Sequence, residues 1–119
     1  YLWRDALLQQ LTHDHSWVAE QVTLGLMSDA EARQHPWRNV VTRALSASDP
    51  PHVDLSPLTL QHRDRLLLSS DGVISDERIG VVLGSAETLE RACQQLIDDA
   101  NAAGGPDNIT TLILEIDVP

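Results

Sequence analysis

Asp71 and Asp107 are the residues of this chain whose type and placement best suit metal chemistry. Asp71 ends the apolar run of "RLLLSSDG", and Asp107 precedes the apolar run from Ile109 to Ile116. If the two runs are neighbouring antiparallel strands, both carboxylates meet at one end of a sheet. Carboxylates brought together repel each other, and the pKa of one rises unless a cation lies between them. Hard cations such as Mg²⁺ and Mn²⁺ prefer oxygen ligands, so the pair predicts half of a metal site.

The alternative interpretation of both aspartates is a turn. Gly, Pro, Asp and Asn are the usual turn residues, and a single Asp in such a setting is more often a turn residue than a ligand. Gly72 follows Asp71 and predicts a turn, while Asn108 follows Asp107 and is expected to orient its loop. One short segment does not decide between a turn and a ligand.

Other residues that could carry chemistry have simpler explanations. His13 and His15 form an H-x-H pair, which on a strand would face one side, but a third zinc ligand with convincing spacing is missing. Ser70 precedes Asp71, yet the sequence lacks the G-x-S-x-G elbow of a serine hydrolase. The single cysteine, Cys93, lies on the apolar stripe of an expected helix and is interpreted as a buried structural thiol.

The composition indicates one acidic globular domain. The chain has 119 residues, of which 42% are hydrophobic, so residues 1–119 are expected to form a single domain with a real core. The formal net charge of −10 argues against binding to nucleic acid or to an anionic membrane, and it allows a divalent-cation site. The sequence shows neither a signal peptide nor an apolar run of about 20 residues, so a cytoplasmic location is expected.

The pattern of apolar residues predicts an α+β fold with antiparallel strands and packed helices. Strands are expected near residues 1–4, 7–12, 53–60, 65–70 and 109–116, with the last one central in its sheet because it is apolar throughout. Helices are expected from Ser16, from Ser28, near residues 76–83 and from Ser85. The last of these carries an apolar stripe at helical spacing, made of Leu89, Ala92, Cys93, Leu96, Ile97 and Ala100.

Four segments occur in an order that resembles a known family. "LTHDHS", "HPWRNVVTRAL", "DRLLLSSDG" and "GGPDNIT" are similar to the second half of the PPM family, the metal-dependent protein serine/threonine phosphatases, and in particular to its bacterial members. A tripeptide such as "SDG" would mean little alone, but the ordered set covers almost the whole chain.

The resemblance implies a fold, a reaction and a set of ligands. The fold would be part of an α-β-β-α sandwich, and the reaction would be hydrolysis of phosphoserine or phosphothreonine in proteins by a metal-activated water, a role in bacterial signalling. Asp71 and Asp107 would be metal ligands for Mg²⁺ or Mn²⁺, supported by Gly72 and Asn108, and residues 18–45 would be a flap-like segment. Phosphorylated proteins would be the substrates.

The chain also departs from the family pattern. The family is longer, and its first half supplies a further metal-bridging aspartate. "RDA" replaces an "RDG"-like turn, and "SSDGVISDERI" is short after its glycine. The piece alone is therefore expected to be inactive and to associate with the missing N-terminal half or with itself. The alternative is a catalytically inactive phosphatase-like module that binds protein partners.

Overall fold

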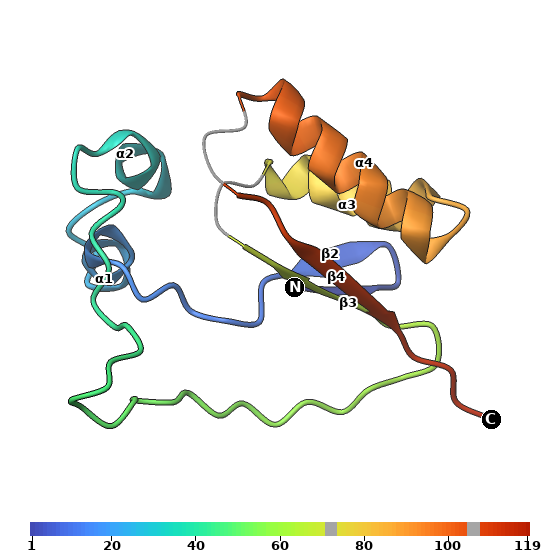
Figure 1. The fold of residues 1–119 in the computed structure, drawn as a ribbon, viewed down its shortest axis with the longest axis horizontal. Helices are drawn as coiled ribbons and strands as arrows, with labels where there is room; N and C mark the ends of the chain where they lie inside the picture. The colour runs from blue at the N-terminus through green and yellow to red at the C-terminus, as the bar shows by residue number, and fades with distance from the viewer. Residues whose placement is uncertain (71–73, 105–107) are drawn as a thin grey trace. The chain divides into compact units, whose positions relative to one another are not determined.

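The computed structural model describes residues 1–70, 74–104 and 108–119 (Figure 1). The contacts of the chain define two compact units. One unit combines Tyr1–Leu11 with Leu58–Pro119, and the other is Thr12–Pro57. Among the described residues, the first unit contains the sheet and two helices, and the second contains two short helices. No helix in the described ranges has the length and apolar character that a membrane span requires.

The sheet of the first unit consists of four short strands. They are β1 (Leu2–Arg4), β2 (Leu7–Gln9), β3 (Arg65–Ser69) and β4 (Thr111–Glu115), in the spatial order β2-β1-β3-β4. Every neighbouring pair is antiparallel, which confirms the predicted α+β class. The central position expected for the last strand was wrong, because β4 lies at an edge of the described sheet.

The hairpin between β1 and β2 has an unfavourable turn residue. Asp5 and Ala6 connect the strands with φ angles of 49° and 62°. Two successive residues at positive φ form the kind of turn that matches the twist of a two-residue hairpin. Glycine, asparagine and aspartate tolerate this conformation, whereas alanine has a Cβ that disfavours it. The hairpin therefore forms as predicted, with strain stored at Ala6.

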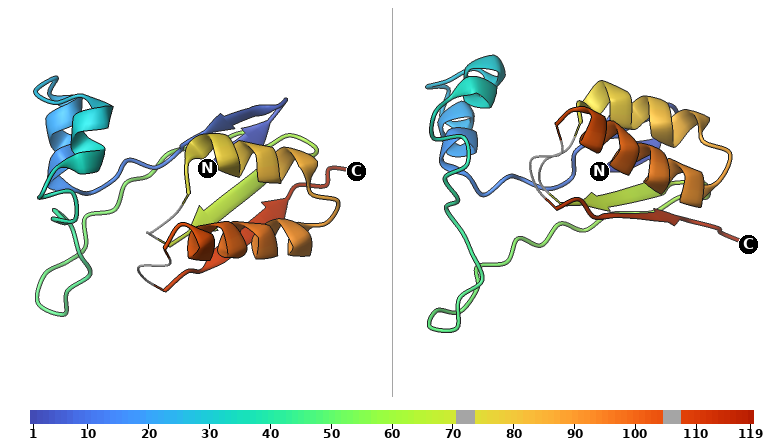
Figure 2. Two further views of the ribbon diagram at one scale, coloured as in Figure 1. Left: turned by 90° about the horizontal axis from the view of Figure 1, so that it is seen from above. Right: turned by 45° about the horizontal axis from the view of Figure 1, so that its top comes forward.

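Two helices cover one face of this sheet. They are α3 (Asp76–Ser85) and α4 (Leu89–Ala102), and both lie on the same side of the strands in the two views of Figure 2. The prediction that Ser85 begins the second helix was wrong. Ser85 ends α3, where its Oγ donates to the carbonyl of Val81, and Thr88 caps α4 by accepting from the amide of Arg91 at 3.1 Å.

The core lies between the helices and the sheet. Leu67 of β3 and Ile113 of β4 are opposite each other in the register, and both are buried against the helical layer. The predicted stripe of α4 faces inward, since Leu96 is only 1% exposed. The core cluster comprises Leu67, Ile79, Val82, Leu83, Ala92, Leu96 and Ile113. Aliphatic side chains thus fill this core, in a chain whose residues are only 3% aromatic.

The other face of β3 and β4 is apolar and exposed. Successive strand residues point to opposite faces, so the neighbours of Leu67 and Ile113 point away from the helices. Leu68, Leu112 and Leu114 have exposed fractions of 55%, 52% and 46%, and Leu66 is half-buried. We call Leu66, Leu68, Leu112 and Leu114 the leucine face. This second apolar face explains why β4 reads as a buried strand in the sequence although it lies at an edge.

A tryptophan packs closely against α3. Trp3 of β1 points to the helical side, where a Cβ added at Gly84 would lie 2.7 Å from its Cζ2 atom. A Cβ at Gly80, one helical turn earlier, would lie 3.2 Å from the same indole. The two glycines therefore allow the helix to approach the sheet at this point, where Trp3 acts as a hydrophobic anchor.

The unit Thr12–Pro57 contains the helices α1 (Trp17–Thr23) and α2 (Asp29–Gln34). Both begin where the sequence predicted. The Oγ of Ser16 accepts from the amide of Ala19 at 3.2 Å, and the Oγ of Ser28 accepts from the amide of Glu31 at 3.1 Å. These side chains satisfy amides that the first helical turn leaves without partners.

An aromatic cluster holds the segment after α2 to the start of α1. The ring of Trp17 lies 5.1 Å from that of His35 and 5.0 Å from that of Trp37, measured between centroids. The amide of Trp17 donates to the carbonyl of Val40 at 2.9 Å, and Val41 forms an isolated bridge with Ser16. Within this segment, strand-like pairing is limited to the single bridge between Val41 and Ser16.

The prediction of a strand at residues 53–60 was wrong. This segment has no regular structure, and Val53 and Leu55 have exposed fractions of 69% and 87%. Asp54 is held instead by side chains, because one carboxylate oxygen lies 2.8 Å from Nε2 of His15 and the other accepts from Arg43 at 2.8 Å. These contacts hold the pKa of Asp54 at about 2, with the hydrogen bond from Arg43 as the main cause. The apolar residues of this segment alternate with polar ones, but no neighbouring strand among the described residues pairs with it.

Candidate metal centre at the end of the β3–β4 pair

The strands beside Asp71 and Asp107 are antiparallel neighbours, which is the condition on which the predicted carboxylate pair depends. The register places Ser69 opposite Thr111, at the end of β3 and the start of β4. Asp71, Gly72 and Asp107 themselves lie outside the described residues, so the convergence of the two carboxylates stays a prediction. Asn108 is described, and it is exposed. The described residues on the strand side of both aspartates therefore lie at one end of the sheet.

The side chain of Ser70 extends the pairing beyond the last residues of the strands. The amide of Ser70 donates to the carbonyl of Thr110 at 2.9 Å. The amide of Thr110 donates in return to the Oγ of Ser70, also at 2.9 Å, and that hydroxyl donates to the carbonyl of Asn108 at 3.2 Å. Sequence reasoning considered Ser70 only as a hydrolase nucleophile. Its place at the end of a buried strand was the available signal for a role in holding this end together.

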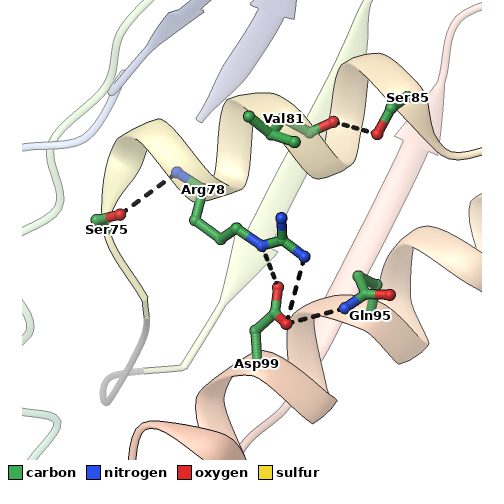
Figure 3. A network of polar contacts seen from close by, with 6 residues as sticks. All are labelled: Ser75, Arg78, Val81, Ser85, Gln95 and Asp99. Carbon is green, nitrogen blue, oxygen red and sulfur yellow. Dashed lines mark hydrogen bonds and ion pairs between the residues drawn. The ribbon is translucent and has the colours of Figure 1, made fainter.

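The helical flanks of the two aspartates are also tied to each other. The Nε of Arg78, in the first turn of α3, donates to Oδ2 of Asp99 in α4 at 2.6 Å (Figure 3). The side chain of Gln95 donates to Oδ1 of the same carboxylate at 2.9 Å. Both bonds hold the pKa of Asp99 below its usual range, and the bond from Arg78 is the larger cause. Arg78 and Asp99 are 21 residues apart, so no local sequence pattern could reveal this pair.

These two sets of contacts join the described residues that flank the two aspartates in the sequence. The segment 71–73 connects β3 to α3, and the segment 105–107 connects α4 to β4. Hydrogen bonds join β3 to β4 at one side of these segments, and the Arg78–Asp99 pair joins α3 to α4 at the other.

A buried carboxylate lies at the opposite end of β3. Asp64 is 1% exposed and accepts two bonds from Arg4, at 2.8 Å from Nε and 2.5 Å from a terminal nitrogen. The amide of Gln61 donates to it at 2.8 Å. The Arg4 bond is the main reason why the pKa of Asp64 lies at about 2. With its oxygens committed to Arg4 and Gln61, this carboxylate joins β1 to β3 and does not act as a ligand.

The described residues do not complete a metal site. Within the described ranges, no group of three or more His, Cys, Asp or Glu side chains could hold an ion. The predicted ligands, Asp71 and Asp107, have the donor chemistry that Mg²⁺ and Mn²⁺ prefer. Both aspartates lie outside the described residues, so their sharing of a site stays a prediction.

The other candidate residues have structural surroundings. The H-x-H pair does not act as a unit, because His15 bonds Asp54 whereas Nε2 of His13 lies 3.5 Å from the hydroxyl of Thr23. Cys93 is half-buried and packs against the core cluster. The contact of Cys93 with the core agrees with a structural thiol, although the residue is half-buried and not buried as predicted.

Comparison with known proteins gives consistent matches to phosphatases. No protein-family model matches the chain. The serine/threonine phosphatase stp of Listeria monocytogenes is 38% identical over 121 residues, which span 99% of this chain and 48% of that protein. The solved serine/threonine phosphatase of S. agalactiae is 37% identical with a TM-score of 0.86, over 94% of this chain and 48% of that one. The catalytic domain of PstP, solved in complex with two manganese ions, is 33% identical with a TM-score of 0.83, over 98% and 49%.

Sequence and fold thus point to the same class. Over nearly its whole length the chain is similar in sequence and in fold to one half of the PPM-type bacterial protein serine/threonine phosphatases, as a C-terminal fragment of such a protein would be. It spans about half the length of the curated relatives that it matches. The α+β arrangement of an antiparallel sheet under two helices is the part of the phosphatase sandwich that this half provides.

Proposed function

We propose that this chain supplies the C-terminal part of a metal-dependent phosphatase that removes phosphate from phosphoserine and phosphothreonine in proteins. The observation that carries the proposal is the antiparallel β3–β4 pair, which places the flanks of Asp71 and Asp107 at one end of a sheet. In that role residues 1–119 are one portion of a larger catalytic domain. The relatives that the chain matches are named as serine/threonine phosphatases, which supports this reaction.

The proposed cofactor is Mg²⁺ or Mn²⁺, held by Asp71 and Asp107 with support from Gly72 and Asn108. The two manganese ions of the PstP structure support this choice. The ions would neutralise the charge of the phosphate and activate a water for attack on phosphorus. The contribution of this chain would be to hold the two carboxylates at a fixed separation, through the Ser70 contacts on one side and the Arg78–Asp99 pair on the other.

The leucine face is the proposed contact with the rest of the catalytic domain. Three of its four leucines, Leu68, Leu112 and Leu114, are exposed, and such apolar patches rarely stay unpaired. Two sheets that pack face to face bury side chains of this kind between them. Because the chain spans about half of each relative, the occupant we propose is the N-terminal half that the relatives carry.

The segment 18–45 is proposed to act as a flap that approaches the phosphorylated substrate. It contains α2, all of α1 except Trp17, and two members of the aromatic cluster, His35 and Trp37. Local contacts within the unit Thr12–Pro57 hold its ends. Arg38 and Arg43 are its candidate phosphate contacts. Arg43 is bonded to Asp54, so Arg38, which donates to the carbonyl of His35 at 3.1 Å, is the more available of the two.

The experiment that tests the proposal compares the chain alone with the chain joined to the N-terminal half of a relative. Hydrolysis of a phosphothreonine peptide is measured with Mn²⁺ present and after its removal by a chelator. The expected result is turnover by the joined protein that requires Mn²⁺ and is abolished by Asp107→Ala. The chain alone should be inactive, because two carboxylates are too few to hold a two-metal centre.

Two outcomes would contradict parts of this proposal. Turnover by the chain alone, abolished by Asp107→Ala, would show that a complete site exists within these residues. A joined protein that folds but neither binds Mn²⁺ nor hydrolyses the peptide would favour the alternative, a catalytically inactive module that binds protein partners.

A further inference from the structure

An open apolar groove runs between α3 and the β1–β2 hairpin, on the helical side of the sheet. Trp3 and Leu8 are opposite each other in the register of the hairpin, so their side chains share one face, and both residues are half-buried. Together with Gly80 and Gly84 of α3 they line a groove of about 540 Å³. The exposed surface of this groove is almost entirely apolar.

The groove exists because α3 carries no side chains where it faces the hairpin. Gly80 and Gly84 are one helical turn apart, and a Cβ added to them would lie 3.2 Å and 2.7 Å from the indole of Trp3. Larger residues would fill the space that these glycines leave open. Val81 also lines the groove, and its side chain is 54% exposed. The described residues thus leave an apolar surface open to solvent along this side of α3.

Acidic side chains lie at one end of the groove. Asp76 and Glu77 form the first turn of α3, line the groove and are exposed. The hydroxyl of Tyr1 donates to Asp76 at 3.1 Å, and a neutral donor does not cancel the charge of a carboxylate. None of the described residues that line the groove is basic. Because binding surfaces pair opposite charges, this end of the groove suits a cationic group beside an apolar one.

We infer that this groove is a docking site for a segment of a partner protein in which an apolar side chain stands beside lysine or arginine. The inference goes beyond the proposed phosphatase function and does not depend on the metal site. The N-terminal half is a poor occupant, because we propose that it covers the leucine face on the opposite side of the sheet. A second copy is disfavoured, because it would bring a net charge of −10 to an acidic groove. Trp3 suits a docking site, since tryptophan is enriched among the residues that dominate binding energy at interfaces.

The test uses short synthetic peptides with a glycine–serine background. They carry leucine or phenylalanine beside arginine, beside glutamate, or without a charged residue. Affinity for the 119-residue chain is measured by fluorescence anisotropy, and the NMR signals of the Trp3 indole and of the Gly80 and Gly84 amides locate the bound peptide. We expect only the peptides with arginine to bind and to shift these signals. Their affinity should fall as salt is added, because salt screens the attraction to exposed carboxylates.

Two pairs of variants separate the groove from the rest of the surface. Glu77 and Glu90 are exposed glutamates in the first turn of a helix, and only Glu77 lines the groove. Glu77→Lys should weaken binding about tenfold through like-charge repulsion, and Glu90→Lys should leave it unchanged. Val81→Ser should weaken binding about fivefold, as the loss of an apolar contact does. Val118→Ser, at a valine that is 50% exposed outside the groove, should have no effect. Urea unfolding checks that each variant is folded.

The leucine face is the other apolar surface that could take up a peptide. The double variant Leu68→Thr with Leu112→Thr should therefore bind the peptides like the wild type, and a loss of binding in it would overturn the inference. Equal effects of Glu77→Lys and Glu90→Lys would overturn it as well, as would the absence of binding to every arginine peptide at millimolar concentration. If the double variant forms dimers that Val81→Ser dissociates, the occupant is a second copy of the chain, and the inference of a basic partner segment fails.

Discussion

Asp64 shows how a carboxylate in this chain serves stability without serving as a ligand. The pKa of its side chain is about 2 in the folded chain, because Arg4 and the amide of Gln61 stabilise the charged form. When the pKa of a carboxyl is lower in the folded than in the unfolded state, the charged group stabilises the fold at pH values above its unfolded-state pKa, which is near 3.8. That contribution is lost as the pH falls from about 4 towards 2.

We therefore expect the wild-type chain to lose stability between pH 4 and pH 2 and Asp64→Asn to lose less over that range, with the remaining loss coming from carboxylates such as Asp54. At pH 7 the variant should be less stable, because the guanidinium of Arg4 loses its charged partner. Urea unfolding at a series of pH values measures both effects. The control is Asp117→Asn at a carboxylate that is 91% exposed, and this variant should keep the acid sensitivity of the wild type. Equal acid profiles for wild type and Asp64→Asn would contradict the interpretation.

Thr111 carries a buried hydroxyl that finds no hydrogen-bond partner within the described part of the chain. A buried polar group without a partner costs about 1–3 kcal/mol, so its removal should stabilise the fold. Valine has nearly the same shape and favours strands. Thr111→Val should raise the free energy of unfolding by about 1 kcal/mol in a denaturant titration. Thr110→Val, at an exposed neighbour, is the control and should change stability by less than about 0.5 kcal/mol.

At the scale of the elements, the β1–β2 hairpin is stable despite its turn. Ala6 has a φ of 62°, a conformation that costs a non-glycine residue about 1–2 kcal/mol. Glycine relieves this strain but loses more conformational entropy on folding, by about 0.5–1 kcal/mol. Ala6→Gly should therefore stabilise the chain by about 0.5–1 kcal/mol in a thermal or urea melt. Ala6→Val adds a branched Cβ at the same φ and should destabilise it, and a stable Ala6→Val variant would mean that this turn is not strained.

The apolar stripe of α4 makes the strongest prediction for an element. Leu96 is 1% exposed and belongs to the core cluster between α4 and the sheet. Leu96→Ala should lower the free energy of unfolding by about 2–5 kcal/mol, as large-to-small changes in cores do. Glu90→Ala, on the exposed side of the same helix, should change it by less than about 0.5 kcal/mol. A cost near zero for Leu96→Ala would show that the stripe is not packed.

The elements that were predictable have signals within a few residues. The caps at Ser16 and Ser28 and the stripe around Leu96 act through backbone amides and one helix face, so a single sequence carries them. The edge position of β4 was not predictable, because its apolar residues supply both a core face and the leucine face. The strand predicted at residues 53–60 does not form, for a related reason. Alternation creates a strand only where a neighbour completes its hydrogen bonds.

The candidate site itself stays a prediction, and the contacts of the described residues beside it were not predictable from the sequence. Asp71 and Asp107 stand out because turn residues at the ends of apolar runs are recognisable in the sequence, and the antiparallel pairing that they require is present in the described strands. The Ser70 contacts depend on where the ladder ends, and the Arg78–Asp99 pair depends on how α3 and α4 pack. Such information arises only after residues far apart in the sequence come together.

At the scale of the whole molecule, the leucine face should dominate the solution behaviour of the chain. A sheet with apolar residues on both faces needs cover on both, and in this chain α3 and α4 cover only one. The net charge of −10 opposes association, but the patch itself consists of leucines. Contiguous apolar patches of several hundred Å² are typical of interaction surfaces. The chain without the N-terminal half should therefore self-associate at micromolar concentrations, and the half that covers the face should prevent this.

Sedimentation velocity of the chain alone, of the chain joined to the N-terminal half, and of two variants tests this expectation. The double variant Leu68→Thr with Leu112→Thr keeps residues that favour strands while it removes apolar area from the centre of the face. It should shift the chain alone towards the monomer, whereas in the joined protein the same change should lower stability, because there the face is expected to be buried. The control is Leu55→Thr, at a leucine that is 87% exposed outside the leucine face, and it should leave the association unchanged. A wild-type chain that stays monomeric at about 100 µM, or association that Leu55→Thr removes equally well, would mean that the leucine face is not the surface that the second half covers.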